Sequence, residues 1–269
     1  MTIALITGGT RGIGNHLVRG FLTAGYRVIF TATDASKARA HAEELATELG
    51  LEHGDRVYGE GVDVTDPNAI DALLSRVREI EAETGDDLGV LINNAGVIEA
   101  PEGPVWDVPP EQLERTITTN VLGPFYMIRA FAPHLLAQAE DGKPARIIDI
   151  NSGSGSHGTP QYAAYSASKV ALFRLADSVH HYGYDKGLRI FELAPGVIRS
   201  DMTTSMPVHD WRGDDDWTKP QDVIDLALGF ASGELDAFSG RFARAGHDTV
   251  KSLKAMNLTE DHRRIRLTL

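Results

Sequence analysis

Short apolar runs rich in β-branched residues recur along the chain, and between them lie longer stretches in which apolar residues return every three to four positions. The short runs are typical of buried strands, and the longer period is typical of helices that lie against a sheet. This alternation predicts an α/β protein in which helices cover both faces of a parallel sheet. The predicted strands are 2–7, 27–33, 56–62, 88–93, 145–151, 188–194 and 241–245, and the predicted helices are 13–24, 35–49, 67–84, 110–139, 161–184 and 220–231.

Two regions interrupt this alternation. Residues 199–218 form a long connection that mixes Met, Trp and Asp, and residues 246–269 form a charged tail. Long loops in compact domains are usually functional or disordered. No repeat or Pro/Gly-rich linker divides the chain, so we expect one domain over residues 1–245 with 199–218 inserted in it. The C-terminal tail 246–269 would cover this domain or pack on a neighbouring subunit.

Composition excludes several classes of protein. The 269 residues include 38 acidic and 26 basic side chains, a formal charge of −12, whereas a nucleic-acid partner needs a basic surface. The absence of cysteine excludes disulfides, thiolate catalysis and thiolate zinc sites. The ten histidines are scattered without metal-ligand spacing, so we expect no metal. No apolar run could span a membrane and no secretory signal starts the chain, which predicts a cytoplasmic protein.

The first predicted strand leads directly into TGGTRGIG, residues 7–14, and then into a helix. Gly8, Gly12 and Gly14 let the main chain turn sharply and let a pyrophosphate approach it closely. The N-terminus of the following helix offers unpaired N–H groups and the positive end of its dipole. The spacing departs from the G-x-G-x-x-G fingerprint, but its place between a strand and a helix predicts dinucleotide binding.

The end of the second predicted strand bears on the choice of cofactor. In NAD-binding domains an acidic residue at this point holds the ribose 2′-hydroxyl. Here Thr31, Ala32 and Thr33 are neutral, and Asp34 comes slightly late. Arg11 lies inside the glycine turn, where a guanidinium can grip a 2′-phosphate. These residues favour NADP(H), and NAD(H) stays open if Asp34 reaches the ribose.

YSASK, residues 165–169, places Tyr165 and Lys169 four apart in a predicted helix, so that both side chains share one face. A phenol ionises near pH ~10, and a nearby cation favours the phenolate and lowers its pKa. The pair is therefore either a proton donor tuned to neutral pH or two solvated side chains on an ordinary helix. The rest of the sequence favours the proton donor.

TGGTRGIG, NNAG at 93–96 and YSASK occur in this order, and with them the chain resembles the short-chain dehydrogenase/reductase family over about residues 2–245. The resemblance implies a single-domain Rossmann fold with a doubly wound, seven-stranded parallel sheet. It also implies an NAD(P)-dependent oxidoreductase that moves hydride between its cofactor and a carbonyl or secondary alcohol. Members of the family are commonly dimers or tetramers, so a homodimer or homotetramer packed through helices 110–139 and 161–184 is expected.

The same resemblance implies a catalytic tetrad. Tyr165 and Lys169 match the family's tyrosine and lysine, and Ser152 lies 13 residues before the tyrosine, as the family serine does. Asn120 falls at the family asparagine, and Ser154 is a rival for the serine with a spacing wrong by two. In these roles Tyr165 is the general acid and base, and Lys169 lowers its pKa and binds the nicotinamide ribose. Ser152 would hold the substrate oxygen, and Asn120 would position a water that links Lys169 to solvent.

The resemblance also assigns contacts with the cofactor. The glycine turn would hold the pyrophosphate, GVDVTD would place Asp63 and Val64 at the adenine, and APGVIRSDM would line the nicotinamide. Ser200 stands where the family often has threonine, so its assigned contact rests on the retained hydroxyl. The full predicted set is Gly8, Thr10, Arg11, Gly12, Ile13, Gly14, Thr33, Asp63, Val64, Asn93, Ala95, Gly96, Tyr165, Lys169, Pro195, Gly196, Ile198 and Ser200.

Substrate contacts would come from the loops after the fourth, fifth and sixth strands. Met202, Met206 and Trp211 in the substrate loop 199–218 suggest an apolar lid, and hence a hydrophobic ketone or aldehyde. Two other functions stay open, an NAD-dependent alcohol dehydrogenase and a dinucleotide-sensing protein without turnover. The remaining predicted pocket residues are Ile98, Glu99, Gly153, His157, Gln161 and Tyr162.

Overall fold

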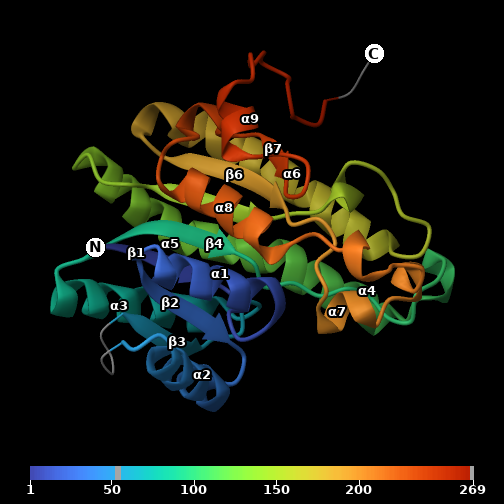
Figure 1. The fold of residues 1–269 in the computed structure, drawn as a ribbon, viewed down its shortest axis with the longest axis horizontal. Helices are drawn as coiled ribbons and strands as arrows, with labels where there is room; N and C mark the ends of the chain where they lie inside the picture. Colours follow the sequence, from blue (N-terminus) through green and yellow to red (C-terminus); the bar gives the residue numbers. More distant parts are fainter. Residues whose placement is uncertain (52–55, 267–269) are drawn as a thin grey trace.

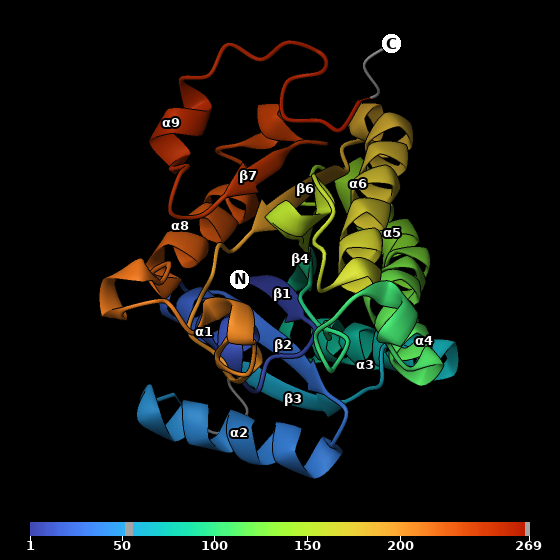
Figure 2. The same ribbon diagram turned by 90° about the vertical axis from the view of Figure 1, so that its right-hand side faces the viewer.

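Residues 1–51 and 56–266 are described by the computed structural model of the chain, and in this part of it seven strands form one sheet (Figures 1 and 2). The strands are β1 Thr2–Ile6, β2 Arg27–Ala32, β3 Val57–Gly61, β4 Asp87–Asn93, β5 Arg146–Ile150, β6 Arg189–Ala194 and β7 Phe242–Arg244. All neighbouring pairs are parallel, in the order β3-β2-β1-β4-β5-β6-β7. The order reverses between β1 and β4, so the sheet is doubly wound and the predicted Rossmann fold is confirmed.

Helices cover both faces of the sheet because parallel neighbours need crossover connections, which run over its faces. The helices of the described residues are α1 Gly12–Thr23, α2 Ala35–Glu48, α3 Pro67–Thr84, α4 Pro110–Ile117, α5 Gly123–Glu140, α6 Ala163–Gly183, α7 Asp201–Thr204, α8 Pro220–Ala231 and α9 Val250–Lys254. One buried cluster joins α1, α2 and α8 to the sheet, and a second joins α3, α5 and α6 to its other face. Among the described residues, no helix has the length and apolar character to cross a membrane.

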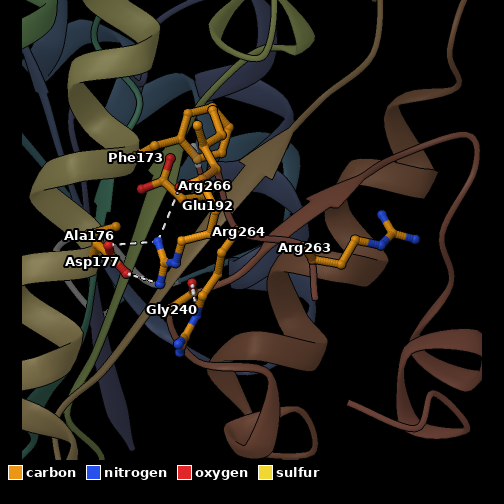
Figure 3. Close-up of a pocket in the computed structure, with 9 residues that line it drawn as sticks. Phe173, Ala176, Asp177, Glu192, Gly240, Arg263, Arg264 and Arg266 are labelled. Atoms are coloured by element: carbon orange, nitrogen blue, oxygen red, sulfur yellow. Dashed lines mark hydrogen bonds and ion pairs between the residues drawn. The ribbon is translucent and has the colours of Figure 1, made fainter. Parts of the chain in front are cut away.

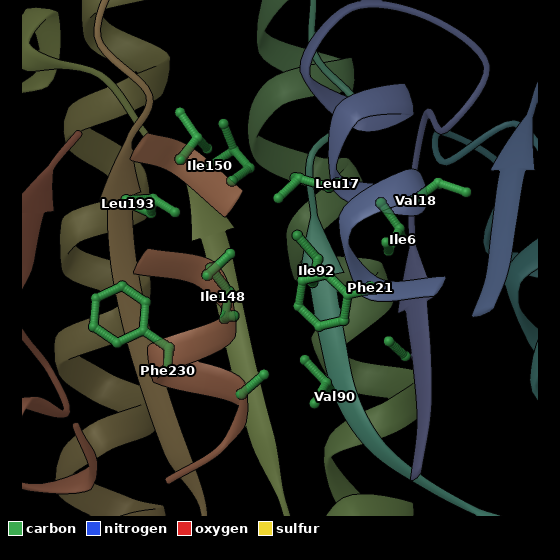
Figure 4. Close-up of a cluster of buried hydrophobic side chains, with 14 of the residues drawn as sticks. Ile6, Leu17, Val18, Phe21, Val90, Ile92, Ile148, Ile150, Leu193 and Phe230 are labelled. Atoms are coloured by element: carbon green, nitrogen blue, oxygen red, sulfur yellow. The ribbon is translucent and has the colours of Figure 1, made fainter. Parts of the chain in front are cut away.

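Both faces of the central strands are apolar because helices cover both. Side chains alternate along a strand, so Leu5 and Ile6 of β1 belong to the two opposite clusters. Figure 4 shows the cluster of Ile6, in which Phe21 of α1 packs near the sheet. In the same cluster Phe191 and Phe230 stack with ring centres 4.4 Å apart. Burial of each such ring contributes about 1.5–3 kcal/mol to folding.

The predicted elements are present within two residues of their predicted bounds, with one exception. The single helix predicted for 110–139 is wrong, because α4 is followed by a π-helical turn, Thr118–Leu122, before α5 begins. A π-helical turn holds one residue more than an α-helical turn, and such turns are frequent at functional sites. Here the turn contains Asn120, which the sequence singles out for another reason.

The substrate loop 199–218 starts and ends at one point of the domain. The Thr218 N–H donates to the Val197 carbonyl at 2.9 Å, and the Val197 N–H donates to the Thr218 hydroxyl at 3.1 Å. Between these residues the loop forms α7 and two short 3-10 turns, Pro207–His209 and Asp214–Asp216. The loop is therefore a folded connection that is tied at its base.

The C-terminal tail lies along the edge strand β7 of its own domain. The Phe242 N–H donates to the Arg263 carbonyl at 3.0 Å. The Arg263 guanidinium is paired with Asp248 at 2.7 Å, and Arg266 is paired with Asp177 of α6 at 2.9 Å. As far as residue 266, the tail thus covers a sheet edge that would otherwise present unpaired main-chain groups. Residues 267–269 of the predicted tail lie outside the described residues.

Candidate active site

The carboxyl ends of the strands bring the predicted site residues to one edge of the sheet. In doubly wound sheets, ligands bind at this edge beside the point where the strand order reverses. That point lies here between β1, which ends in the glycine turn, and β4, which ends in Asn93. Ser152 follows β5 and Pro195 follows β6 at the same edge.

Glycine is required at two positions of the turn. Gly8 has a φ of +70°, and a Cβ on Gly14 would lie 2.0 Å from the Gly8 carbonyl oxygen. Thr7 and Asn94 hold this shape, because the Thr7 hydroxyl accepts the Asn94 N–H at 3.0 Å and the Asn94 amide donates to the Gly8 carbonyl at 3.1 Å. Arg11, at the N-cap of α1, makes no side-chain cap bond, so the first N–H groups of the helix remain available to an anion. The turn therefore fits a pyrophosphate.

Asn94 was absent from the residues that the sequence assigns to the cofactor. The sequence feature that could have indicated it is the second asparagine of NNAG. The side chain of this asparagine ties the loop after β4 to the glycine turn. Of the other predicted contacts, Thr10 and Ile13 are half-buried in the turn, Ala95 and Gly96 follow β4, and Gly196 and Ile198 follow β6.

The substrate loop begins beside the glycine turn. A Cβ on Gly12 would lie 3.7 Å from the Cβ of Ser200, and the Arg11 guanidinium lies 3.5 Å from the Asp201 carboxylate. Ser200 is the N-cap of α7, and its hydroxyl accepts the Thr203 N–H at 3.3 Å. The hydroxyl for which a cofactor contact is predicted thus already has a capping role.

Asp34, the acid that follows β2, caps α2. Its Oδ1 accepts the N–H groups of Ser36 at 2.9 Å and of Lys37 at 3.1 Å, and also the Ser36 hydroxyl at 2.6 Å. These bonds, the Ser36 hydroxyl first, hold the pKa of the Asp34 carboxyl below its usual value. The start of the helix therefore occupies this carboxylate, while Thr33 beside it is neutral and exposed.

The residues predicted for the adenine side differ in exposure. Asp63 is exposed and accepts the Thr65 N–H at 2.9 Å, whereas Val64 is buried against Gly123, whose Cβ would lie 3.0 Å from it. Asn93 is buried, and its amide donates to Asp149 at 2.7 Å. Asn93 therefore ties β4 to β5 and supports the central sheet.

Tyr165, Lys169 and Ser152 meet at the end of β5. The Lys169 ammonium lies 5.5 Å from the centre of the Tyr165 ring and donates to the Ile150 carbonyl at 2.7 Å. The Ser152 hydroxyl lies close enough to the Tyr165 hydroxyl to lower the pKa of this phenol. The Ser152 hydroxyl also accepts the Ser154 N–H at 3.1 Å, so Ser154 supports Ser152 through its main chain.

The pKa of Tyr165 is shifted in the opposite direction to the sequence-based expectation. Burial of the phenol raises this pKa, the hydrogen bond from Ser152 offsets part of the rise, and the charge of Glu99 adds to it. The Lys169 ammonium bonds to the Ile150 carbonyl, and its charge does not reverse the shift. Burial lowers the pKa of Lys169 itself to about 8, against the opposing charges of Glu192 and Asp149.

Asn120 joins the loop after β4 to α6. Its Oδ1 accepts the Val97 N–H at 2.8 Å, and its Nδ2 donates to the Val97 carbonyl at 2.8 Å and to the Ser168 hydroxyl at 3.0 Å. The π-helical turn presents this amide to both segments. These bonds give Asn120 a structural role, and its predicted contact with a water stays a prediction.

The sequence predicts Glu99 in the substrate pocket, whereas the structure uses its buried carboxylate to cap α6. The two oxygens accept the Ala164 N–H at 2.8 Å and the Tyr165 N–H at 2.9 Å. A carboxylate at a helix N-terminus satisfies unpaired N–H groups and complements the dipole. The local N-cap residue is Tyr162, which makes no side-chain cap bond, and this missing cap was the available signal.

The remaining predicted pocket residues differ in exposure. Tyr162 is buried, and its hydroxyl donates to Glu102 at 2.6 Å. Trp211 of the substrate loop is 68% exposed, and Trp106, which the sequence-based set lacks, is 82% exposed. Met202, Met206, Ile98, Gly153 and Gln161 are half-buried, and His157 is exposed.

Two further acids, absent from the predicted site, lie beneath Lys169. Asp149 of β5 and Glu192 of β6 are buried, and their charges raise the pKa of Lys169. The available signal was a single acid in each of two otherwise apolar strands, ARIIDIN and LRIFELA. In the described part of the chain, no group of three or more His, Asp and Glu side chains could hold a metal ion.

The arrangement can perform acid–base chemistry next to a bound dinucleotide. Tyr165 offers a proton, Ser152 offers a hydroxyl that can hold an oxygen atom, and Lys169 offers a positive charge. The glycine turn at the same edge of the sheet offers main-chain N–H groups for phosphates. These are the groups needed to add or remove a proton on oxygen while a cofactor exchanges hydride with the neighbouring carbon.

Comparisons with known proteins show the family to which this chain belongs. A sequence model of the short chain dehydrogenase family matches residues 2–210. A 1-deoxy-11-beta-hydroxypentalenate dehydrogenase from Streptomyces exfoliatus is 31% identical over 244 residues, which cover 90% of this chain and 84% of the relative.

Solved structures share the fold over most of the chain. RhlG of Pseudomonas aeruginosa, in an active-site complex with NADP, is 27% identical with a TM-score of 0.76, covering 90% of this chain and 94% of that one. A 3-ketoacyl-(acyl-carrier-protein) reductase of Brucella melitensis, complexed with NADH, is 24% identical with a TM-score of 0.78, covering 90% and 96%. The family match, the fold and the site together place this chain in the short chain dehydrogenase family, as an NAD(P)-dependent oxidoreductase that acts on carbonyl and alcohol substrates.

Proposed function

We propose that the protein reduces the carbonyl group of an apolar ketone or aldehyde with NADP(H), and that Tyr165 is its general acid. The observation that carries this proposal is the meeting of Tyr165, Ser152 and Lys169 at the end of β5. This point lies at the same edge of the sheet as the glycine turn. A proton donor, an oxygen-binding hydroxyl and a cation beside a phosphate cradle are the groups that carbonyl reduction needs.

The proposed reaction adds a hydride and a proton to the carbonyl group. A nicotinamide cofactor, when bound at this edge of the sheet, would supply the hydride for the carbonyl carbon. As negative charge develops on the oxygen, the Tyr165 hydroxyl gives its proton to that oxygen, and the Ser152 hydroxyl donates a hydrogen bond that holds the oxygen in reach. The raised pKa of Tyr165 keeps the phenol protonated at neutral pH, which suits a proton donor. In the reverse direction the phenolate takes the proton from the alcohol.

Lys169 stabilises the state that follows proton transfer. The phenolate left on Tyr165 carries a negative charge, and the Lys169 ammonium lies 5.5 Å from the centre of that ring. A pKa of about 8 leaves this ammonium mostly charged at neutral pH and able to pass on a proton. Lys169 therefore stabilises the phenolate more than the neutral phenol, that is, after the proton has left Tyr165.

Arg11 and Asp34 together support NADP(H) over NAD(H). The Arg11 guanidinium is largely exposed at the glycine turn, and its 3.5 Å contact with the equally exposed Asp201 is a weak ion pair. It can therefore turn to a 2′-phosphate. Asp34 is bound to the first turn of α2, and Thr33 brings no negative charge to repel that phosphate. The RhlG complex with NADP is consistent with this choice.

Exposed aromatic rings in the connections after β4 and β6 support an apolar substrate. Trp106 follows β4, and Trp211 lies in the substrate loop, and both rings are largely exposed. Met202 and Met206 in the same loop are half-buried and supply flexible apolar surface. An apolar substrate would bury part of this surface, with a gain of about 25 cal/mol for each Å² removed from water.

We also propose that the chain self-associates through α4, α5 and α6. Ile117, Leu122, Phe125 and Val170 expose between 38% and 44% of their surface on these helices and the π-helical turn. Light scattering after size-exclusion chromatography should give a dimer or a tetramer, and Phe125→Glu should reduce the assembled fraction. A monomer at micromolar concentration would contradict this part of the proposal.

The test of function combines cofactors with a panel of carbonyl compounds. NADPH or NADH is mixed with the protein and ethyl acetoacetate, acetophenone, cyclohexanone or benzaldehyde, and the loss of the reduced-nicotinamide absorbance is followed. We expect turnover with NADPH and slower turnover with NADH. Equal or faster turnover with NADH would support the NAD-dependent alternative. Cofactor binding without turnover of any of these compounds, or of their alcohols, would support a dinucleotide-sensing protein instead.

The role of Arg11 has a matched control on the neighbouring helix. Arg11→Ala should raise the KM for NADPH about tenfold, since a charged hydrogen bond contributes about 1.5–3 kcal/mol, and should leave the KM for NADH unchanged. Arg19 of α1 is paired instead with Glu48 of α2, so Arg19→Ala should change neither KM. An equal loss with both cofactors in Arg11→Ala would contradict recognition of the 2′-phosphate.

A further inference from the structure

A buried polar layer lies between the sheet and α6. Leu91 of β4, Ile147 of β5 and Ile190 of β6 belong to the cluster on the α6 face of the sheet. Since side chains alternate along a strand, residues two or four positions further on point to the same face, and at the carboxyl edge these residues are polar. They are Asn93, Asp149, Asn151 and Glu192, with exposures between 0% and 4%.

The two acids of this layer lie opposite each other on neighbouring strands. Asp149 and Glu192 are register partners on β5 and β6. Asn93 donates to one oxygen of Asp149 at 2.7 Å, and Asn151 donates to one oxygen of Glu192. The other oxygens, Asp149 Oδ2 and Glu192 Oε1, are buried and receive no hydrogen bond from any donor in the described residues. Two such carboxyl oxygens on neighbouring strands can bond to each other only if one of the two groups keeps a proton.

Burial and like charge both oppose ionisation of the whole pair. Burial raises the pKa of Asp149 to about 6, even though Asn93 donates to it. Burial, and then the charge of Asp149, raise the pKa of Glu192 well above its usual range. The first proton leaves the pair easily and the second is retained, as for other pairs of carboxyl groups that share a site. Near neutral pH the pair therefore holds one proton and one negative charge.

Lys169 reaches this layer from α6. Its side chain is buried, and its ammonium bonds to the carbonyl of Ile150, the residue between Asp149 and Asn151. The charges of Glu192 and Asp149 raise the pKa of Lys169 against the effect of burial. Without them the ammonium would have the Ile150 carbonyl dipole as its partner, and burial would favour the neutral amine.

The other charged groups near the pair have partners of their own. A small cavity beside Glu192 is lined by α6 and by the C-terminal tail (Figure 3). From β7, the Arg241 carbonyl accepts the Glu192 N–H at 3.1 Å, and on α6 Tyr165 lies one turn before Lys169. The charged residues that line the cavity are Asp177 with Arg266, Arg263 with its partner Asp248, and Arg264, which donates to the Gly240 carbonyl.

We propose that Asp149 and Glu192 are positioning residues that share one proton and present a single negative charge to Lys169, which keeps its ammonium charged and in place during carbonyl reduction. The inference rests on the proposed role of Lys169. A neutral pair would let the buried amine of Lys169 lose its proton, and in a doubly charged pair the two carboxylates would repel each other. A pair that shares one proton avoids both the loss of the lysine proton and this repulsion.

The test replaces the acids singly and together, as Asp149→Asn, Glu192→Gln and the double variant. In each single variant the remaining acid has no like-charged neighbour and the Lys169 charge still lowers its pKa, so we expect this acid to ionise and one negative charge to persist. The double variant carries no negative charge at these two positions. Activity is measured in the reductive direction with saturating NADPH and the carbonyl compound of the panel that turns over fastest. We expect the high-pH midpoint of activity to stay in place in both single variants and to fall by about one pH unit in the double variant.

This pattern separates a shared charge from a merely structural role. A structural role would lower stability and kcat and would leave the midpoint of the pH profile unchanged in all three variants. A midpoint that stays in the double variant, or that moves as far in either single variant as in the double variant, would overturn the proposal. Far-UV circular dichroism and cofactor fluorescence show whether each variant is folded.

The shared proton has a readout that does not depend on turnover. At neutral pH, infrared difference spectra should show the C=O stretch of one protonated carboxyl group in the wild-type protein, and both single variants should lack it. A wild-type protein without this band, or a single variant that retains it, would sink the inference even if the double variant did not fold. If no carbonyl compound were reduced, the proposed function would fail while this band still reported on the pair.

Discussion

Two polar clusters lie at the carboxyl edge of the same sheet, and they are built from opposite kinds of side chain. Beneath the glycine turn, Thr7 and Asn94 are neutral, and they hold the main chain through hydrogen bonds of 3.0 to 3.1 Å. Beneath α6, Asp149, Glu192 and Lys169 are ionisable. Burial raises the pKa of both acids and lowers the pKa of the lysine, so it favours the neutral form of each group. The first cluster therefore fixes a shape, and the second fixes a charge.

The difference shows what each half of the site needs. A pyrophosphate needs N–H groups at fixed positions, and neutral bonds hold them in place at any pH. Proton transfer needs groups whose charge can change near neutral pH, and burial brings lysine and carboxyl pKa values into that range. A buried charge costs free energy unless it is paired. The second cluster therefore lowers the stability of the fold while it provides groups that can change charge. The variants below break one cluster at a time.

Tyr165→Phe should have the largest effect, because it removes the proton donor and leaves the rest of both clusters in place. Turnover should fall by about 10³-fold, within the range of general acid catalysis, while cofactor binding stays close to wild type. Steady-state rates and cofactor fluorescence measure the two quantities. Tyr182→Phe is the matched control on α6, since its ring is 71% exposed. Retained turnover in Tyr165→Phe would rule out the acid role.

The double variant Asp149→Asn/Glu192→Gln should reveal the free-energy cost of the ionisable cluster. The folded-state pKa of Asp149 is raised from 3.8 to about 6. Its contribution to stability is therefore fully present below about pH 4 and is lost as pH rises through about 6. Between these limits, the titration of Asp149 should lower the free energy of unfolding of the wild type relative to the double variant by on the order of 3 kcal/mol. The raised pKa of Glu192 should add to this fall and extend it above pH 6. Urea denaturation at several pH values measures it, and a difference that is constant with pH would contradict the raised pKa.

Gly14→Ala should break the neutral cluster with no dependence on pH. The added Cβ would lie 2.0 Å from the Gly8 carbonyl oxygen, so the turn must open, at a cost of about 1–3 kcal/mol in stability. Dinucleotide affinity should fall at least about tenfold, since 1.4 kcal/mol is a factor of ten. Gly103→Ala is the control, because nothing lies within 4 Å of its Cβ position. An unchanged Kd in Gly14→Ala would argue against the turn as the phosphate site.

Glu99→Gln should have the smallest effect and should link the helix cap to the chemistry. Loss of the charge at the start of α6 should cost about 1 kcal/mol in stability. Because the charge of Glu99 raises the pKa of Tyr165, its loss lowers that pKa. In alcohol oxidation, where the phenolate is the base, the low-pH midpoint of activity should therefore move to lower pH. Glu102→Gln is the control in the same loop, and a midpoint equal in both variants would exclude the coupling.

Local patterns were enough for much of this protein. The periods of apolar residues predicted the strands and helices within two residues of their bounds, except at the π-helical turn. Strand-to-helix turns need glycine for reasons within a few residues, and a spacing of four places Tyr165 and Lys169 on one helix face. Each of these inferences depends on neighbours along the chain, which is the information that a sequence carries directly.

Contacts between distant segments decided the rest. Glu99 accepts the Ala164 N–H, 65 residues further along the chain, at the start of α6. Asp149 lies opposite Glu192 only through the register of β5 and β6. The upward shift in the pKa of Tyr165 follows from burial, which no spacing reveals. The sequence by itself determined the order of elements, the glycine turn and the Tyr165–Lys169 pair. The tertiary structure decided which acids stand beside them and which protons they keep, because the energy of a buried charge depends on neighbours that only folding brings together.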